Sequence, residues 1–186
     1  MPSLARFAVV ALVGITALTL GACAPDDHQL GPAPTGEGTF DPATDPVNAS
    51  VGLNCGELLT DQVVYDWGSG NFALDVDYEP AAGSAAAQIV TEGGLACRWV
   101  NLTSSETVDV AVAAPESTVL ESAAATAAES AEPATAISPT AYFSSADGIG
   151  RVDAFTDRYW LTAQSSWFLG QEDAAPLITA AIAALG

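Results

Sequence analysis

The pattern of hydrophobic and polar positions divides the chain into three parts. Residues 7–20 form a largely apolar run, residues 24–50 are polar and rich in proline, and from Leu53 onward short apolar segments alternate with polar turns. About 134 residues from Leu53 to the end are a normal size for one domain with one core. The pattern therefore predicts a leader (1–22), a spacer (23–52) and a single folded domain (53–186).

Alternation of apolar and polar residues predicts the strands of this domain. Residues 72–78 alternate along their whole length, which is typical of a half-buried strand. Residues 95–102 and 107–113 flank a Thr-Ser-Ser turn and predict a hairpin. The second hairpin strand has Val108, Val110 and Val112 on one face, and further short strands are expected at about 141–144, 151–155 and 159–164.

Helical spacing of apolar residues predicts four helices. Thr60 is a good cap for a short helix that ends at Gly68, and the alanine-rich stretch 82–91 precedes two glycines that favour a helix end. A third helix is expected from Pro115 to about Ser130 and a fourth from about Asp173. Their expected inward positions are Val63, Val64 and Trp67; Val119, Leu120, Ala123, Ala124 and Ala127; and Leu177, Ile178, Ala181, Ile182 and Leu185.

The order of elements predicts an α+β fold. Because short turns join neighbouring strands, the sheet should be mostly antiparallel, with the helices packed on one face. We expect one disulfide, since Cys55 and Cys97 form an even pair once Cys23 is assigned to the leader junction. Closing this loop of about forty residues should contribute about 3 to 4 kcal/mol. The alternative is a pair of buried free thiols.

Cys23 carries the prediction of a lipid anchor. It follows Leu20-Gly21-Ala22 at the end of a charged, apolar leader that is too short to span a bilayer, which needs about 20 residues. Bulky Leu20 disfavours an ordinary cleavage after Ala22, and cleavage after Ala24 would leave Pro25 at the new N-terminus. We therefore expect a bacterial lipoprotein with acylated Cys23, held at the extracytoplasmic face of the cell membrane.

The spacer and the charge constrain the partners. Residues 24–50 contain five prolines and three large apolar residues, so they predict a flexible tether. The only histidine, His28, lies in this tether, where a solvated side chain is expected. All 23 acidic residues follow Cys23, against three arginines, so the mature charge is near −20 and repels nucleic acid. Lysine is absent, and this composition is associated with GC-rich genomes such as those of actinobacteria.

Two short motifs suggest a family. Cys55-Gly56-Glu57-Leu58-Leu59-Thr60 and Cys97-Arg98-Trp99, behind a lipobox and a proline-rich tether, resemble actinobacterial lipoproteins with the domain of unknown function numbered 3558. The resemblance covers about Leu53 to Gly186. It implies a small α+β envelope domain in which Cys55 and Cys97 are bonded, and it carries no catalytic residues.

The residue inventory excludes several kinds of chemistry. Residues 53–186 contain no histidine and no lysine, so a Ser-His-Asp site, a Schiff base and a P-loop cannot be built there. A zinc site would need carboxylates alone if both cysteines are bonded. No cofactor is expected.

Two other chemistries are open. Paired carboxylates would allow a glycan hydrolase, which needs two acids about 5 to 10 Å apart. Asp75, Asp77 and Glu79 lie on one face of the predicted strand 72–78, where a hard cation such as Ca²⁺ is one hypothesis and a solvated strand face is the other.

Aromatic residues supply the remaining candidates. Tyr159 and Trp160, and Trp167 and Phe168, flank the last predicted strand and its exit. Adjacent strand residues point to opposite faces, so one member of the first pair should be core. Core packing is the default for Trp99 and Trp160, whereas an exposed cluster would receive a sugar or an apolar ligand. The sequence thus favours a non-catalytic binding or interaction domain of the envelope, with a small ligand or envelope protein as partner. The alternatives are a carboxylate-dependent glycan hydrolase and a purely structural lipoprotein.

Overall fold

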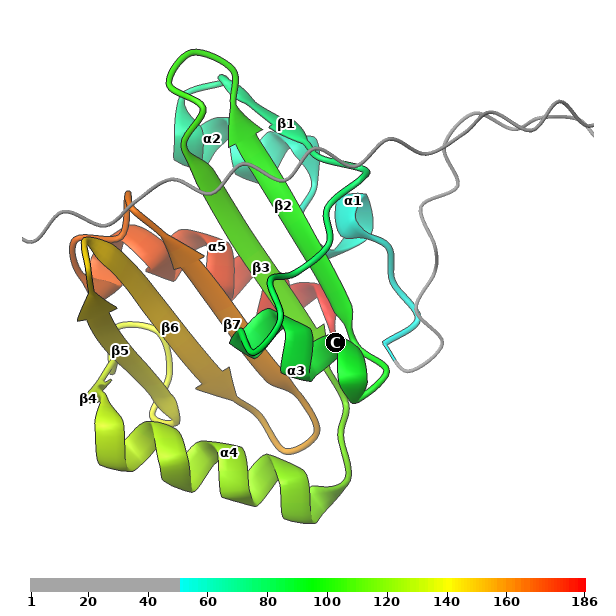
Figure 1. Ribbon diagram of the computed structural model, residues 1–186, viewed down its shortest axis with the longest axis vertical. Helices are drawn as coiled ribbons and strands as arrows, with labels where there is room; N and C mark the ends of the chain where they lie inside the picture. The colour runs from blue at the N-terminus through cyan, green and yellow to red at the C-terminus, as the bar shows by residue number, and fades with distance from the viewer. Residues whose placement is uncertain (1–50) are drawn as a thin grey trace, which may run out of the picture. The chain divides into compact units, whose positions relative to one another are not determined.

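Seven antiparallel strands form one sheet in the computed structural model, which describes residues 51–186. The strand order is β1-β2-β3-β7-β6-β5-β4, and all pairs are antiparallel (Figure 1). The strands are β1 (Phe72–Leu74), β2 (Leu95–Asn101), β3 (Thr107–Ala113), β4 (Glu132–Pro133), β5 (Ala141–Ala146), β6 (Ile149–Phe155) and β7 (Trp160–Ser165). The α+β class and the antiparallel sheet agree with the sequence prediction.

Five helices accompany the sheet: α1 (Cys55–Leu58), α2 (Asp61–Gly68), α3 (Ala85–Thr91), α4 (Ser117–Ser130) and α5 (Gln171–Ala184). Side-chain oxygens cap three of them, because Asn54, Thr60 and Ser84 each accept a hydrogen bond from a backbone N–H in the first turn. Pro115 precedes α4 instead of lying in its first turn. Within residues 51–186 no helix is long and apolar enough to cross a bilayer.

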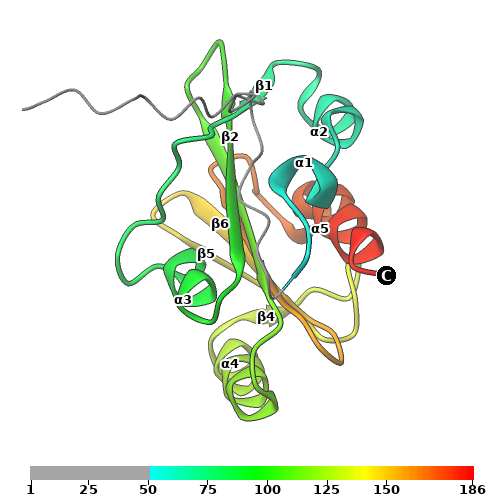
Figure 2. The same cartoon turned by 90° about the vertical axis from the view of Figure 1, so that its right-hand side faces the viewer.

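The expectation that helices cover one face of the sheet was wrong. Helices α1, α2 and α5 lie on one side of the sheet, and α3 and α4 lie on the other (Figure 2). The first side holds the larger core, to which Val108, Val110 and Val112 contribute. The second holds a smaller core in which Ala111 and Ala113 meet α3 and α4. Strand β3 is buried on both faces, and its side chains alternate between the two cores.

The predicted strand 72–78 is also shorter than expected. Strand β1 ends at Leu74, and the chain turns because the Asp75 carboxylate accepts a hydrogen bond from the Asp77 backbone N–H at 3.2 Å. The backbone N–H of Tyr78 then points back to the Asp75 carbonyl at 3.4 Å. The segment from here to Ser84 crosses the front of the sheet and leads into α3 (Figure 1).

Candidate functional site

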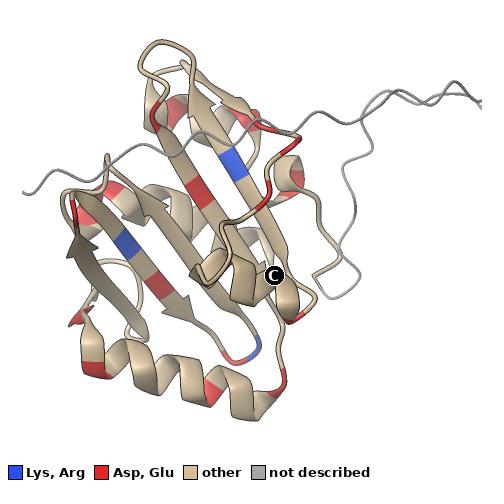
Figure 3. Cartoon of the chain, viewed as in Figure 1, with Lys and Arg blue, Asp and Glu red and all other residues tan. Residues whose placement is uncertain are grey.

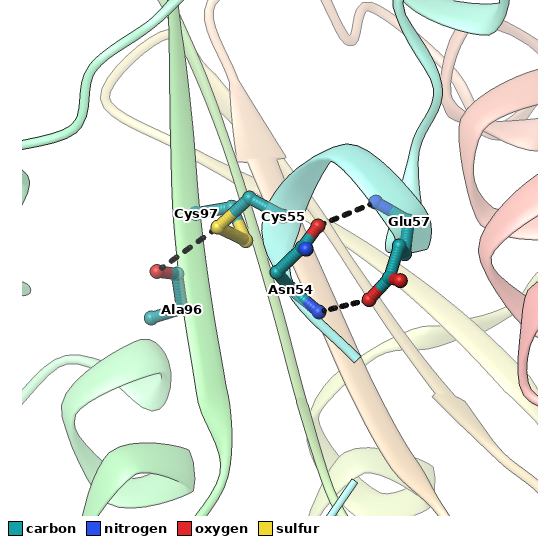
Figure 4. The surroundings of a disulfide bond; sticks show 5 residues. All are labelled: Asn54, Cys55, Glu57, Ala96 and Cys97. Atoms are coloured by element: carbon teal, nitrogen blue, oxygen red, sulfur yellow. Dashed lines mark hydrogen bonds between the residues drawn. A yellow bond between two sulfur atoms is a disulfide. The ribbon is translucent and has the colours of Figure 1, made fainter. Parts of the chain in front are cut away.

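The cysteine pair joins α1 to β2. Cys55 and Cys97 form a disulfide with 5.7 Å between their Cα atoms, and both residues are buried (Figure 4). A capping box beside it holds α1, since the Asn54 side chain and the Glu57 side chain each accept from the other residue's backbone N–H. The disulfide prediction is confirmed, and the free-thiol alternative is excluded. Neither sulfur is available as a nucleophile or a metal ligand.

The structure does not bring the acidic trio together as a metal site. Asp75, Asp77 and Glu79 follow the end of β1 in the turn, so they do not share a strand face. In the part of the chain that the structure describes, no group of three or more His, Cys, Asp or Glu side chains is arranged to hold a metal ion. The calcium hypothesis assumed that these three residues share one face of a strand, and that assumption was wrong.

The four predicted aromatic residues separate into two places. Trp160 is buried in the smaller core, while half-buried Tyr159 packs against the larger one, as their adjacent positions in the sequence require. Phe168 is also core. Trp167 remains 38% exposed and contacts two aromatic residues that the sequence had not linked to it, Trp67 and Phe72, with ring centroids 5.7 and 5.1 Å away.

This aromatic cluster borders an open hollow of about 530 Å³ beside α2 and α5. The Trp67 indole N–H donates to the Asp173 backbone carbonyl at 2.8 Å, which fixes one side of the hollow. Glu172 and Asp173 also line the hollow. The cluster is therefore a packed seam between α2, β1 and the β7–α5 loop.

A larger groove lies on the opposite face of the sheet. It has a volume of about 670 Å³ and runs between α3 and α4. Such a volume is typical of small-molecule sites. The floor is formed by three side chains from β6 and β7, namely Arg151, Asp153 and Trp160. The sequence analysis assigned neither Arg151 nor Asp153 a role, and it named Trp160 among the aromatic candidates with core packing as its default.

One floor residue, Arg151, belongs to a polar row that crosses the sheet. Arg98, Asp109, Gln164, Arg151 and Ser144 are register partners from β2 through β3, β7 and β6 to β5. All therefore point to the face that carries α3 and α4. Figure 3 shows the two arginines of this row as blue bands on β2 and β6 beside red acidic bands. The row lies beyond the small core formed by the two helices, so helices cover only one end of this face.

The end of the row on β2 and β3 is a closed network. Asp109 is 3% exposed and accepts from Arg98 Nε at 2.6 Å and Nη2 at 2.8 Å. The Tyr78 hydroxyl and Gln164 Nε2 each donate to Asp109 Oδ2 at 3.1 Å. The Arg98 guanidinium also lies 4.1 Å from the centre of the Tyr78 ring. Every partner of this carboxylate thus comes from the protein itself.

Two pKa values respond to this network. Burial first, and then the charge of Asp109, raise the pKa of the Tyr78 phenol above its ordinary value. The hydrogen bond to Asp109 raises the pKa of the Arg98 guanidinium, against the opposing effect of burial. The neutral phenol and the charged guanidinium are therefore the forms that the fold stabilises.

The end of the row on β6 is incomplete. Arg151 Nη2 donates to Asp153 Oδ1 at 2.8 Å, and the buried Trp160 indole N–H donates to the same oxygen at 3.1 Å. Arg151 Nε is buried and has no hydrogen-bond partner within residues 51–186. Buried donors are almost always paired, and an unpaired one costs about 1–3 kcal/mol. Nε itself is closed off from the groove, whereas the Arg151 side chain as a whole is 38% exposed and lines the floor.

Hydroxyl groups line the walls of the groove. Thr91 on α3 and Thr126 and Ser130 on α4 each donate to a carbonyl one turn earlier in their own helix, at 3.0, 2.9 and 2.7 Å. Their oxygens keep lone pairs that can accept from a ligand. Glu92 adds a carboxylate to the wall. The walls are thus rich in acceptors.

Two features of the sequence, not used in the sequence analysis, are consistent with a polar face here. Asp109 interrupts a run of valines and alanines, and a buried acid in such a strand requires a cationic partner. The alternation of Arg151 and Asp153 with Val152 and Ala154 is the second feature.

Cys23 and the predicted tether lie outside the described residues.

Comparisons of this chain with protein-family models, with curated proteins and with solved structures found no match. The resemblance to the domain of unknown function numbered 3558 therefore stays a prediction from the sequence motifs.

Proposed function

We propose that this protein is a lipid-anchored, extracytoplasmic binding domain without catalytic activity, and that the groove between α3 and α4 holds its ligand. One observation carries the proposal. The groove of about 670 Å³ lies over a charged floor in which the Arg151 guanidinium, 38% exposed, donates only through Nη2 to an acceptor within residues 51–186.

The chemistry of the groove supports binding over catalysis. Its walls are hydroxyls and small apolar side chains, and residues 53–186 lack histidine and lysine. Both cysteines are held in the disulfide. The two buried carboxylates of this face, Asp109 and Asp153, each accept from an arginine at 2.6 and 2.8 Å. A glycosidase instead needs one acid that is free to give its proton to the substrate.

The anchor part of the proposal rests on the lipobox that ends at Cys23. An acylated cysteine with more than one chain would hold the domain at the membrane. Membrane fractionation of the wild type and of Cys23→Ala tests this part. The wild type should pellet with membranes, and the variant should be soluble. A variant that still pellets would contradict the anchor.

Ligand retention tests the binding part. We suggest gentle extraction of the full chain from membranes, followed by native mass spectrometry. Ser122→Trp places an indole in the groove from an exposed position of α4. Ala128→Trp is the matched control, because Ala128 is exposed on the same helix and does not line the groove.

The outcomes separate the candidate functions. The wild type and Ala128→Trp should retain the same small molecule, and Ser122→Trp should lose it. A cleaved ligand that accumulates over time would favour the glycan hydrolase. An empty wild-type monomer, or equal retention by all three proteins, would contradict the proposal, the first outcome in favour of a structural lipoprotein.

A further inference from the structure

We infer that the ligand of the groove is a neutral saccharide or another ligand of dense hydroxyl groups. The inference rests on the proposed function, in which the groove is a binding site, and it adds the chemical class of the ligand. The walls of the groove offer hydrogen-bond acceptors and the floor offers donors. A hydroxyl-rich ligand can pair with both.

The groove walls favour a ligand that donates hydrogen bonds. The hydrogen atoms of the Thr91, Thr126 and Ser130 hydroxyls are used inside their own helices. What these side chains offer the groove is therefore an acceptor oxygen each. The ionised Glu92 carboxylate on the same wall can accept hydrogen bonds but cannot donate one. A ligand without donors would displace water from these oxygens without replacing its hydrogen bonds.

The groove floor favours a ligand that also accepts hydrogen bonds. The Arg151 side chain is 38% exposed in the groove, and within residues 51–186 only its Nη2 donates to an acceptor. The bond from Nη2 to Asp153 sets the orientation of the guanidinium before any ligand arrives. A ligand oxygen beside the exposed part of this guanidinium would accept from an N–H group that no described residue uses.

Only some ligand classes satisfy both demands. A polyamine donates but has no oxygen for Arg151. An anion accepts but meets Glu92 and Asp153 in the groove and a chain of net charge −19 around it. A hydroxyl group both donates and accepts, and saccharides present many of them with no charge.

A peptide also donates and accepts, but the groove is less suited to its side chains. The apolar part of the lining consists mainly of small residues such as Ala123, Ala127 and Ala131. Its one large aromatic residue, Trp160, is only 5% exposed and is held in the core by its neighbours. Deep apolar pockets, which give peptide recognition its specificity, are thus missing from the described lining.

The test uses the full chain on a glycan array that carries neutral oligosaccharides of glucose, mannose, galactose and N-acetylglucosamine together with acidic ones. Spermine and penta-alanine are tested in parallel by calorimetry. Thr126→Val removes an acceptor oxygen from the wall at nearly constant shape. Thr179→Val makes the same change at an exposed position of α5, on the opposite side of the sheet.

We expect a neutral oligosaccharide to bind the wild type and Thr179→Val equally, and Thr126→Val about 5- to 10-fold more weakly, as the loss of one hydrogen bond predicts. Arg151→Met should weaken the same binding at least tenfold. Binding of spermine or penta-alanine in place of saccharides would overturn the saccharide inference and leave the groove as a site. If no neutral saccharide binds, the inference also fails, and ligand retention in the native mass spectra then decides separately whether the groove is a site at all.

Discussion

The two faces of the sheet are made from the same strands but have opposite character. On one face Val108, Val110 and Val112 enter a closed apolar core under α1, α2 and α5. On the other face Asp109 lies between two of these valines in sequence, and it joins the polar row that leads to the groove. The difference shows that strand alternation gives one sheet a face with a large apolar core and a second face on which a smaller core lies beside a polar row.

The disulfide and the helices α1, α2 and α5 explain why only the first face is closed. The disulfide joins α1 to β2, and α5 lies along the same side, packed against α1 and α2. On the groove side, α3 and α4 are rich in alanine and pack over a small core that includes Ala111, Ala113, Phe155 and Trp160. The rest of that face carries the polar row and is not covered by these two helices.

Removal of the disulfide should have the largest effect on this comparison. The double variant Cys55→Ala, Cys97→Ala should lose about 4 kcal/mol of unfolding free energy, because the bond closes a loop between residues 42 apart. Urea unfolding with circular dichroism provides the measurement. A loss below about 1 kcal/mol would mean that packing closes this face without the covalent bond.

The buried acid of the polar row should have the next largest effect. Asp109→Ala leaves Arg98, the Tyr78 hydroxyl and Gln164 without their acceptor, so we expect a loss of about 3 kcal/mol. Val110→Ala, at the next position but on the closed face, should cost about 2 kcal/mol through a small cavity. The two are compared by urea unfolding under identical conditions. A smaller loss for Asp109→Ala than for Val110→Ala would contradict the view that the network is a unit.

High pH should weaken the polar face selectively. The pKa of Tyr78 is raised in the folded state, so above about 10, where an unfolded tyrosine ionises, the unfolded chain releases a proton that the folded chain keeps. The stability that this phenol contributes is therefore present below pH 10 and lost as the pH rises further. Tyr78→Phe keeps the ring beside Arg98 and removes the ionisable group.

Urea unfolding of both proteins at pH 8 and near pH 11 measures this difference. The wild type should be the more stable protein at pH 8, and its advantage over Tyr78→Phe should shrink toward pH 11. An advantage that stays constant would show that the phenol is not held neutral by its surroundings.

The groove variants should have the smallest effect on stability. Ser122→Trp and Ala128→Trp both change exposed positions of α4, so each should alter the unfolding free energy by no more than about 0.5 kcal/mol. Urea unfolding checks this directly. A large loss for Ser122→Trp alone would mean that its effect on ligand retention reports folding instead of binding.

Elements with strong local periodicity could be predicted from the sequence. The hairpin of β2 and β3 and the helix α5 have apolar residues at regular spacing, and the structure has both. The disulfide could be inferred because two cysteines remain after Cys23 is assigned to the leader. Strand 72–78 was overestimated because a local side-chain hydrogen bond of Asp75 turned the chain where the alternation continued.

The groove could not be predicted, because it depends on pairing between distant strands. Asp109 meets Gln164 only when β3 pairs with β7, and Gln164 meets Arg151 only through β6. No local pattern sets these registers. Helices α3 and α4 were predicted at nearly their observed positions, but the face that they cover was wrong, because it depends on the buried alanines of β3 beneath them.

Two indole N–H groups, one on each face, give the most direct test. Trp160 donates to Asp153 in the groove floor, and Trp67 donates to the Asp173 carbonyl on the closed side. Two-dimensional ¹⁵N NMR of the full chain, titrated with an equimolar mixture of neutral glucose, mannose, galactose and N-acetylglucosamine oligosaccharides, follows both at once. We predict that the Trp160 signal shifts and saturates while the Trp67 signal stays in place. A stationary Trp160 signal would contradict the saccharide inference, and a shift of Trp67 alone would contradict the assignment of binding to the groove.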